Sequence, residues 1–114
     1  MTENTVIDVL GTKYVIKECS VEEEPFLKEC DGFCDKTSKI ICITKKKPEH
    51  DFDYFETYQR KILRHEIIHA FFYESGLQEN FEHPNRYGHD ETTVDWFAVQ
   101  WTKIHKAFLE AKCL

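Results

Sequence analysis

Two histidines and a glutamate stand in the pattern His-Glu-x-x-His, at His65, Glu66 and His69. Residues four apart on a helix lie nearly above one another, so the two imidazoles can bind one metal ion. Imidazole nitrogens are common ligands of Zn²⁺, which keeps one position for water in catalytic sites. Glu66 would lie beside that water, accept its proton as general base and return it as general acid. The spacing therefore predicts zinc-assisted hydrolysis.

The same pattern also fits a helix without metal, in which the two histidines are ordinary core residues. In that case both imidazoles and the carboxylate are buried among apolar neighbours such as Ile67 and Ile68. Unpaired polar groups in such surroundings cost about 1–3 kcal/mol each. Because a bound cation removes this cost, we expect His65 and His69 to bind zinc.

A third ligand is expected from the stretch after the histidines, which offers His83, His89, Asp90, Glu91 and Asp95. Glu91 and Asp95 are four residues apart at the start of a second predicted helix. They share its core-facing side, which carries Val94 and Ala98. We therefore assign Glu91 as the third zinc ligand and Asp95 as the acceptor that holds His65 in its metal-binding tautomer. In the alternative, Glu91 is a carboxylate at a helix N-terminus, stabilised by the helix dipole.

Hydrolysis at a carbonyl group also needs a hydrogen-bond donor for the oxyanion. The loop before Glu91 offers three candidates, Tyr87, His83 and His89, each of which can equally be an exposed loop side chain.

Two long helices must carry these residues. Residues 54–75 contain no Gly or Pro and repeat apolar side chains at helical spacing, which predicts a central helix that Gly76 ends. Asp51 or Asp53 is the expected N-cap, and the apolar last two turns are expected to be buried. Residues 91–111 predict a second helix, packed on the first through one apolar stripe. The stripe consists of Val94, Phe97, Ala98, Trp101, Ile104 and Phe108.

Four short strands are expected before the first helix, at residues 6–10, 13–17, 31–35 and 40–44. The first two are rich in β-branched side chains and flank Gly11 and Thr12, which predicts a hairpin. The other two flank a polar tip at residues 36–39 and predict a second hairpin. The acidic stretch between the hairpins predicts a turn into a short irregular or helical segment. The expected fold is α+β, a small antiparallel sheet packed on two long helices.

The length, composition and net charge of the chain argue against several classes of protein. With 114 residues the chain has room for one domain, residues 1–114, and its 14% aromatic residues exclude a disordered chain. A net charge of −6 opposes direct binding to nucleic acid. Without a membrane-spanning run or a signal peptide, we expect a cytoplasmic protein with no membrane partner, whose five cysteines remain free thiols.

The zinc motif and the second helix together resemble the gluzincin pattern of thermolysin-type metallopeptidases. In that pattern a later helix provides a glutamate ligand and a nearby aspartate, at the positions that Glu91 and Asp95 occupy here. A closer resemblance is to the ImmA/IrrE-type metallopeptidase domain. It is carried by Asp31-Gly32-Phe33, residues 40–43, the run from Arg64 to Ala70, and Glu91-x-x-Val94-Asp95-x-Phe97-Ala98. The resemblance implies a minimal zincin-like domain and a cytoplasmic zinc peptidase of bacteria or phages, often acting on a repressor protein.

Two functions from different classes remain. The first is a zinc metallopeptidase that cleaves a protein or peptide substrate. Its peptide is expected to add as a strand at the edge of the sheet, beside residues 40–43, where the scissile carbonyl group would reach the zinc. The second is a non-catalytic protein-binding module in which zinc is structural. A purely structural site usually has four protein ligands, whereas His65, His69 and Glu91 make three and Glu66 completes a catalytic set, so the peptidase is favoured. A third possibility, an interaction protein without metal, would hold no stoichiometric zinc.

Overall fold

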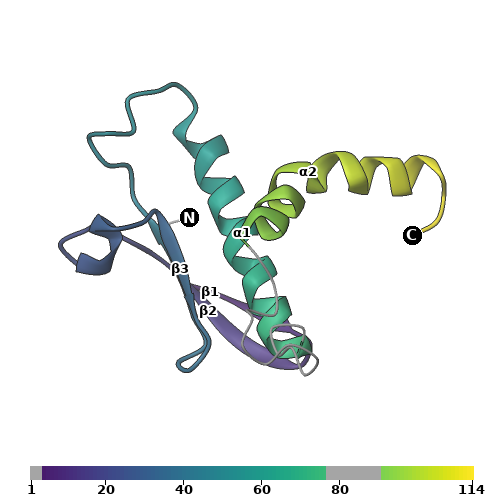
Figure 1. Cartoon of the computed structure of the whole chain (residues 1–114), viewed down its shortest axis with the longest axis horizontal. Coiled ribbons are helices and arrows are strands. Elements are labelled where there is room, and N and C mark those ends of the chain that lie inside the picture. Colours follow the sequence, from purple (N-terminus) through teal and green to yellow (C-terminus); the bar gives the residue numbers. More distant parts are fainter. Residues whose placement is uncertain (1–3, 77–90) are drawn as a thin grey trace.

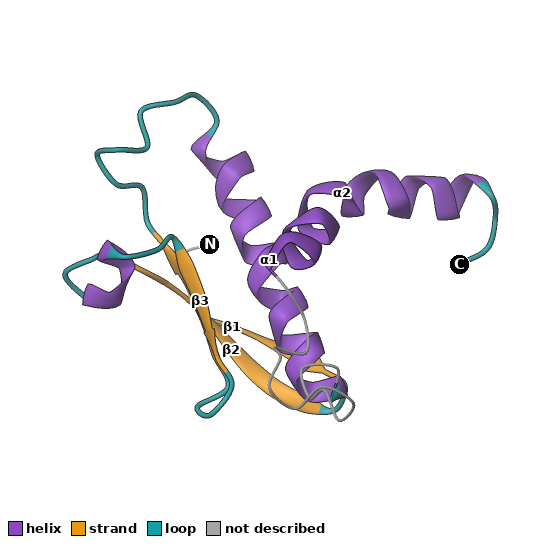
Figure 2. Cartoon of the chain, in the orientation of Figure 1, coloured by secondary structure: helices purple, strands orange, loops and turns teal. Residues whose placement is uncertain are grey.

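Two β-hairpins and two long helices form the computed structural model, which describes residues 4–76 and 91–114 (Figure 1). The strands are β1 (Thr5–Val9), β2 (Thr12–Cys19), β3 (Gly32–Asp35) and β4 (Ile40–Thr44). The helices are the short 3₁₀ helix η1 (Pro25–Lys28), α1 (Phe55–Ser75) and α2 (Glu91–Glu110). Helix α1 contacts both the sheet and α2 and lies between them (Figure 2). The expected α+β class is confirmed.

The first hairpin turns at Leu10 and Gly11, one residue earlier than the sequence predicts. Val9 pairs with Thr12, which leaves a two-residue turn. Both turn residues have positive φ, 52° for Leu10 and 93° for Gly11. This combination matches the twist of the two strands and favours glycine, which explains the residue at position 11.

The sheet is mixed, so the expected antiparallel sheet is wrong for one strand pair. In the order β1-β2-β4-β3, strand β4 pairs antiparallel with β3 but parallel with β2. The reason is that β4 is an almost uninterrupted apolar run and nearly all buried, which favours a central position. Strand β3 is half-buried and forms the edge. The expectation that residues 40–43 lie at the edge is therefore wrong as well.

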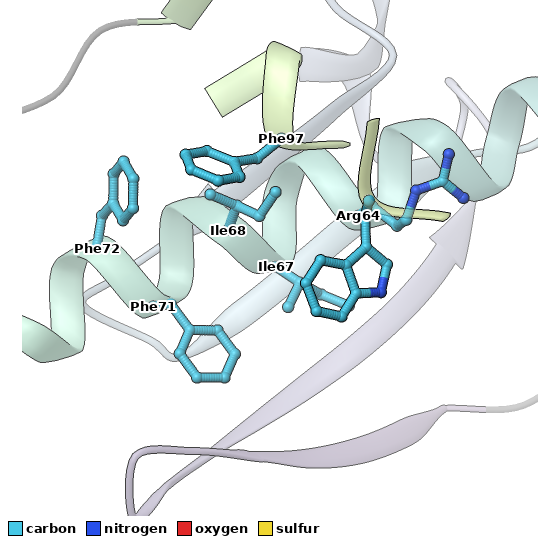
Figure 3. A pocket seen from close by; sticks show the side chains of 7 residues that line it. Arg64, Ile67, Ile68, Phe71, Phe72 and Phe97 are labelled. Atoms are coloured by element: carbon cyan, nitrogen blue, oxygen red, sulfur yellow. The ribbon is translucent and has the colours of Figure 1, made fainter. Parts of the chain in front are cut away.

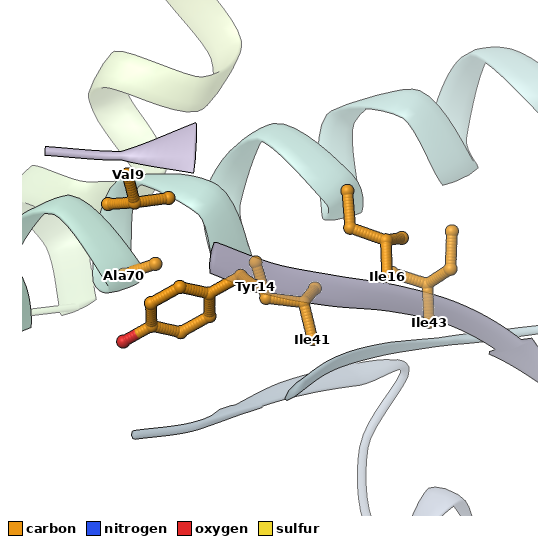
Figure 4. Packing of buried hydrophobic residues seen from close by; sticks show 6 residues of the cluster. All are labelled: Val9, Tyr14, Ile16, Ile41, Ile43 and Ala70. Carbon is orange, nitrogen blue, oxygen red and sulfur yellow. The ribbon is translucent and has the colours of Figure 1, made fainter. Parts of the chain in front are cut away.

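The core lies between the sheet and α1 (Figure 4). Its central members, each at most 2% exposed, are Val9, Tyr14, Ile16, Ile41, Ile43 and Ala70. The strand residues among them alternate along β2 and β4 and therefore share the face that packs on α1. Burying each of the larger side chains contributes roughly 1.5–3 kcal/mol. Since Ala70 follows His69 directly, this contact also fixes the rotation of the helix that carries the His-Glu-x-x-His pattern.

Helix α1 begins without the aspartate cap expected at Asp51 or Asp53, both of which are exposed. Tyr54 is the capping residue, in the left-handed conformation with φ 63°, and it has no side-chain cap among the described residues. The preceding loop is held by His50, which is 4% exposed and whose Nε2 lies 3.2 Å from Asp31 Oδ2. Because this contact is tertiary, local capping preferences do not decide where the helix starts.

The other end of α1 stops at Gly76 as predicted, with a φ of 81°. Just before it, Glu74 ties the helix to the sheet. Its carboxylate accepts hydrogen bonds from Lys39 Nζ (2.8 Å), Tyr14 OH (2.7 Å) and Thr12 Oγ1 (2.8 Å). These three bonds lower the pKa of Glu74 to about 2. The half of α1 that carries the His-Glu-x-x-His pattern is thereby anchored to β2.

Replacing Glu74 with Gln is expected to lower the free energy of unfolding by about 1–2 kcal/mol at neutral pH, because charge-assisted hydrogen bonds are lost. The folded-state pKa lies below the ordinary 4.5, so the stabilisation is complete above that pH and is lost as the pH falls toward 2. Urea unfolding of both proteins across that range measures the effect. The control Glu110→Gln, at an exposed residue, should change little. A wild-type advantage that persists undiminished at low pH would contradict this role.

Helix α2 packs on α1 mainly through its first half. Val94 and Ala98 are fully buried, and Arg64 Nε donates a 2.6 Å hydrogen bond to the Ala98 carbonyl oxygen. Beyond Ala98 the helix extends away from α1 (Figure 1). The end of α1, expected to be buried, leaves Phe71 38% exposed. In the part of the chain that the structure describes, no helix is both long and apolar enough to cross a membrane.

Candidate metal centre

His65 and His69 lie one turn apart on α1 with their imidazole rings close together. The two Nε2 atoms are 3.2 Å apart and the ring centroids 4.9 Å apart. His69 is 6% exposed and His65 is half-buried. The helix thus presents two imidazole nitrogens at one point, as the four-residue spacing predicts.

Glu91, the first residue of α2, brings its carboxylate to the same point. Its Oε1 lies 2.6 Å from His69 Nε2 and its Oε2 lies 3.5 Å from His65 Nε2. One donor atom from each of the three residues lies within 4.8 Å of the others. In a tetrahedral site with zinc–ligand bonds of about 2.0–2.1 Å, donor atoms are about 3.3 Å apart. The three side chains therefore fit a zinc ion in both donor type and spacing.

Asp95, one turn further along α2, contacts the outer nitrogen of His65. The distance from His65 Nδ1 to Asp95 Oδ1 is 3.1 Å, and the same oxygen accepts a 3.2 Å hydrogen bond from Lys61 Nζ. Partial burial would raise the pKa of Asp95, but the bonds from Lys61 and His65 outweigh it and lower this pKa. A carboxylate at Nδ1 favours the tautomer whose Nε2 is free to bind metal.

Glu66 lies beside the cluster and is not among its converging donors. It is 8% exposed, and it lines a hollow of about 280 Å³ together with His69 and Glu91. Burial, and then the nearby Glu91 carboxylate, raise the pKa of Glu66 to about 7. A cation held by the cluster would favour the ionised form and lower this pKa. The arrangement suits a carboxylate that exchanges a proton near neutral pH.

The hollow is bounded on one side by the edge strand β3, through Gly32, Phe33 and Cys34. A Cβ at Gly32 would lie 2.8 Å from Ile62 Cγ2 and 3.4 Å from Glu66 Cγ. Glycine therefore allows β3 to approach α1 closely at Ile62, one turn before Glu66. Burial raises the pKa of the Cys34 thiol to about 12. This side chain therefore stays protonated at neutral pH when no cation is bound to it.

Tyr73 is a residue of the hollow that the sequence analysis did not single out. It follows His69 by one turn, its ring stacks on the imidazole at 6.1 Å with an interplanar angle of 19°, and it lines the same hollow. The spacing His65, His69, Tyr73 repeats every four residues, so this signal was available in the sequence. The three donors expected in the preceding analysis, Tyr87, His83 and His89, lie outside the described residues.

Comparisons of the chain with protein-family models, with curated proteins and with solved structures give no match. Support for a function therefore comes from the site itself. Its main features are three converging donor atoms, a buried carboxylate beside them, and a hollow that an edge strand borders.

Proposed function

We propose that the chain is a zinc-dependent metallopeptidase that hydrolyses a peptide bond in a protein substrate. The observation that carries the proposal is the convergence of His65, His69 and Glu91 beside the buried Glu66. The first three residues would hold the metal; bound Zn²⁺ supplies an acidified water and a polarised carbonyl group. Three protein ligands next to a hollow favour a catalytic site over a closed structural one.

Glu66 is the residue proposed to move the proton. Its carboxylate accepts a proton from the attacking water and returns it to the leaving amide nitrogen. Burial favours this task because it weakens competition from bulk water and holds the group in place. Asp95 supports the reaction at a distance by orienting the imidazole of His65.

The substrate is proposed to lie along β3 as an added strand. Among the described strands, β4 is paired on both sides, whereas β3 is paired on one side only and borders the hollow that contains Glu66. An extended peptide on that edge would present its main chain to the zinc cluster. Phe26 of η1 and Phe33 meet edge to face at 5.3 Å and also line the hollow. They offer an apolar contact for one substrate side chain.

Tyr73 is proposed as the donor that stabilises the developing oxyanion. Tyr73→Phe is expected to reduce the turnover number by about 10- to 1,000-fold, because one hydrogen bond to the transition state is lost. The zinc content should not change, since the phenol is not part of the donor cluster. The control is Tyr54→Phe, at an 80% exposed tyrosine. Equal loss in both variants, or no loss in Tyr73→Phe, would remove Tyr73 from this role.

The resemblance to ImmA/IrrE-type domains extends the proposal to a zincin-like fold and a cytoplasmic peptidase of phage or bacterial origin. In that setting the substrate is a repressor or another regulatory protein. The alternative is a non-catalytic protein-binding module with a structural zinc site. The two differ in the use of Glu66, which a structural site would not need.

Digestion of an unstructured protein and of a mixed peptide library tests the proposed function. Zinc-loaded protein is expected to produce new fragments in mass spectra, a chelator should stop their formation, and added zinc should restore it. A protein that holds zinc stoichiometrically but cleaves neither substrate would support the binding-module alternative.

A further inference from the structure

Lys61 lies one turn before His65 on α1 and contacts the candidate metal centre through Asp95. Its Nζ is 3.2 Å from Asp95 Oδ1, and the same oxygen is 3.1 Å from His65 Nδ1. A single carboxylate oxygen therefore joins a cation to a proposed metal ligand. Both members of the Lys61–Asp95 ion pair are partly buried, so water and salt screen this pair less than one on the open surface.

The polar contacts between α1 and α2 form a ladder with a regular order. Its members, spaced four residues apart, are Lys61, His65 and His69 on α1 and Glu91 and Asp95 on α2. Asp95 bridges Lys61 and His65. One turn along, Glu91 bridges His65 and His69. A shift of α2 along α1 would therefore break the contact of Lys61 and separate Glu91 from the histidines at the same time.

Apolar packing fixes the position of α2 on α1 only in part. Val94 and Ala98 are fully buried, but the same two helices also border a cavity of about 530 Å³ that is lined mainly by apolar side chains. In Figure 3 the ring of Phe97 lies beside Ile68, whereas Phe71 stands apart from it. Closely interdigitated side chains are what normally fixes one helix against another. Because these side chains leave a cavity, the polar ladder has a larger share in positioning α2.

We propose that Lys61 is a positioning residue of the metal centre, an inference that rests on the zinc site of the proposed function. Lys61 holds the carboxylate of Asp95 on His65 and keeps α2 where Glu91 meets the two histidines. The end of Lys61 is itself held in place, because its Nζ lies 5.6 Å from the centre of the Tyr58 ring, within the range of a cation–π contact. Ligands that are held in place before they bind lose less entropy on binding, which raises the affinity for the metal.

The direction of the effect on zinc affinity separates this role from a simple effect of charge. Removal of a positive charge near a cation site would by itself strengthen the binding of a cation. Removal of a positioning residue weakens it, as does the loss of other partners of ligating residues. Lys61→Met retains an unbranched apolar stem and removes the charge and the hydrogen-bond donor. Weaker zinc binding in this variant would therefore indicate positioning.

Competition with a coloured chelator measures the zinc affinity of the whole chain and of its variants. Lys61→Met is expected to raise the dissociation constant of zinc about 3- to 10-fold, less than the loss of a direct partner of a ligand. Lys61→Arg retains the charge and the donor and should stay within about twofold of wild type. The matched control is Arg60→Met, which removes a positive charge from the neighbouring, exposed residue and should not weaken binding. Circular dichroism shows whether each variant is folded, and Lys61→Gln replaces Lys61→Met in the comparison if the latter does not fold.

A double-mutant cycle tests whether Lys61 acts through Asp95. In an Asp95→Ala background, Lys61→Met should weaken zinc binding by less than about twofold, because the carboxylate that Lys61 positions is absent. An equal loss with and without that carboxylate would overturn the inference. So would a zinc-binding wild type whose Lys61→Met variant binds zinc equally well or more tightly. A wild-type chain that takes up no zinc would instead contradict the proposed function, and this inference with it.

Discussion

Glu66→Gln is expected to reduce peptide cleavage by about 100- to 10,000-fold while the protein keeps one zinc per chain. Gln has the shape of Glu but cannot accept a proton from water, and Glu66 is not among the converging donors. Initial cleavage rates and elemental analysis of the same preparation give both quantities. The separation of activity from metal content is the signature of a proton-transfer residue.

The control for this variant is Glu56→Gln, which changes an exposed glutamate on the same helix. It should retain wild-type activity. Because burial disfavours the charged form of Glu66, Glu66→Gln should also unfold at a higher temperature than wild type in the presence of a chelator. Wild-type turnover in Glu66→Gln would show that another group moves the proton.

His69→Ala is expected to weaken zinc binding by more than about 100-fold, because loss of a partner outside the ligand shell already costs 10- to 100-fold. His69 contributes the atom nearest to Glu91, at 2.6 Å, so its removal breaks the cluster at its closest contact. Competition with a coloured chelator measures the affinity. His105→Ala, at an exposed histidine in the second half of α2, is the control and should bind zinc normally.

Glu91→Ala separates the third ligand from its alternatives in the same titration. A large loss of affinity supports Glu91 as a ligand. An unchanged dissociation constant would transfer that role to His83, His89 or Asp95.

Local spacing predicts much of the candidate site. His65 and His69 meet because an i, i+4 pair shares one side of any helix, wherever the helix packs. Glu91 and Asp95 reach them because the helix side that carries Val94 and Ala98 is buried against α1. The 3.6-residue period of the α-helix, applied to both helices, is therefore enough to predict which of these side chains come together.

The order of the strands in the sheet depends on tertiary contacts, which the local spacing of residues does not predict. The sequence predicts two hairpins, but it does not say which arm of the second hairpin pairs with β2. The greater burial of β4 favours β4 as the strand that pairs with β2. The run of apolar residues at 40–44 was the sequence signal that could have indicated this pairing. This one choice places β3 instead of β4 at the edge of the described sheet beside the candidate site, and with it the proposed position of the substrate.

Helix periodicity has a similar limit at the ends of α1. It identifies Phe71 as apolar but cannot say whether a neighbour covers it, and the structure leaves it 38% exposed. At the other end, the contact between His50 and Asp31 spans 19 residues of chain and overrides the capping preference of Asp51 and Asp53. Both differences arise from tertiary packing that a local pattern does not encode.

The zinc content of the purified chain tests the central claim most directly. Elemental analysis after dialysis should find one zinc per chain in the wild type, and much less in His69→Ala prepared in the same way. A wild-type protein that holds only traces of metal, and takes up none when zinc is added and the excess removed, would contradict the account.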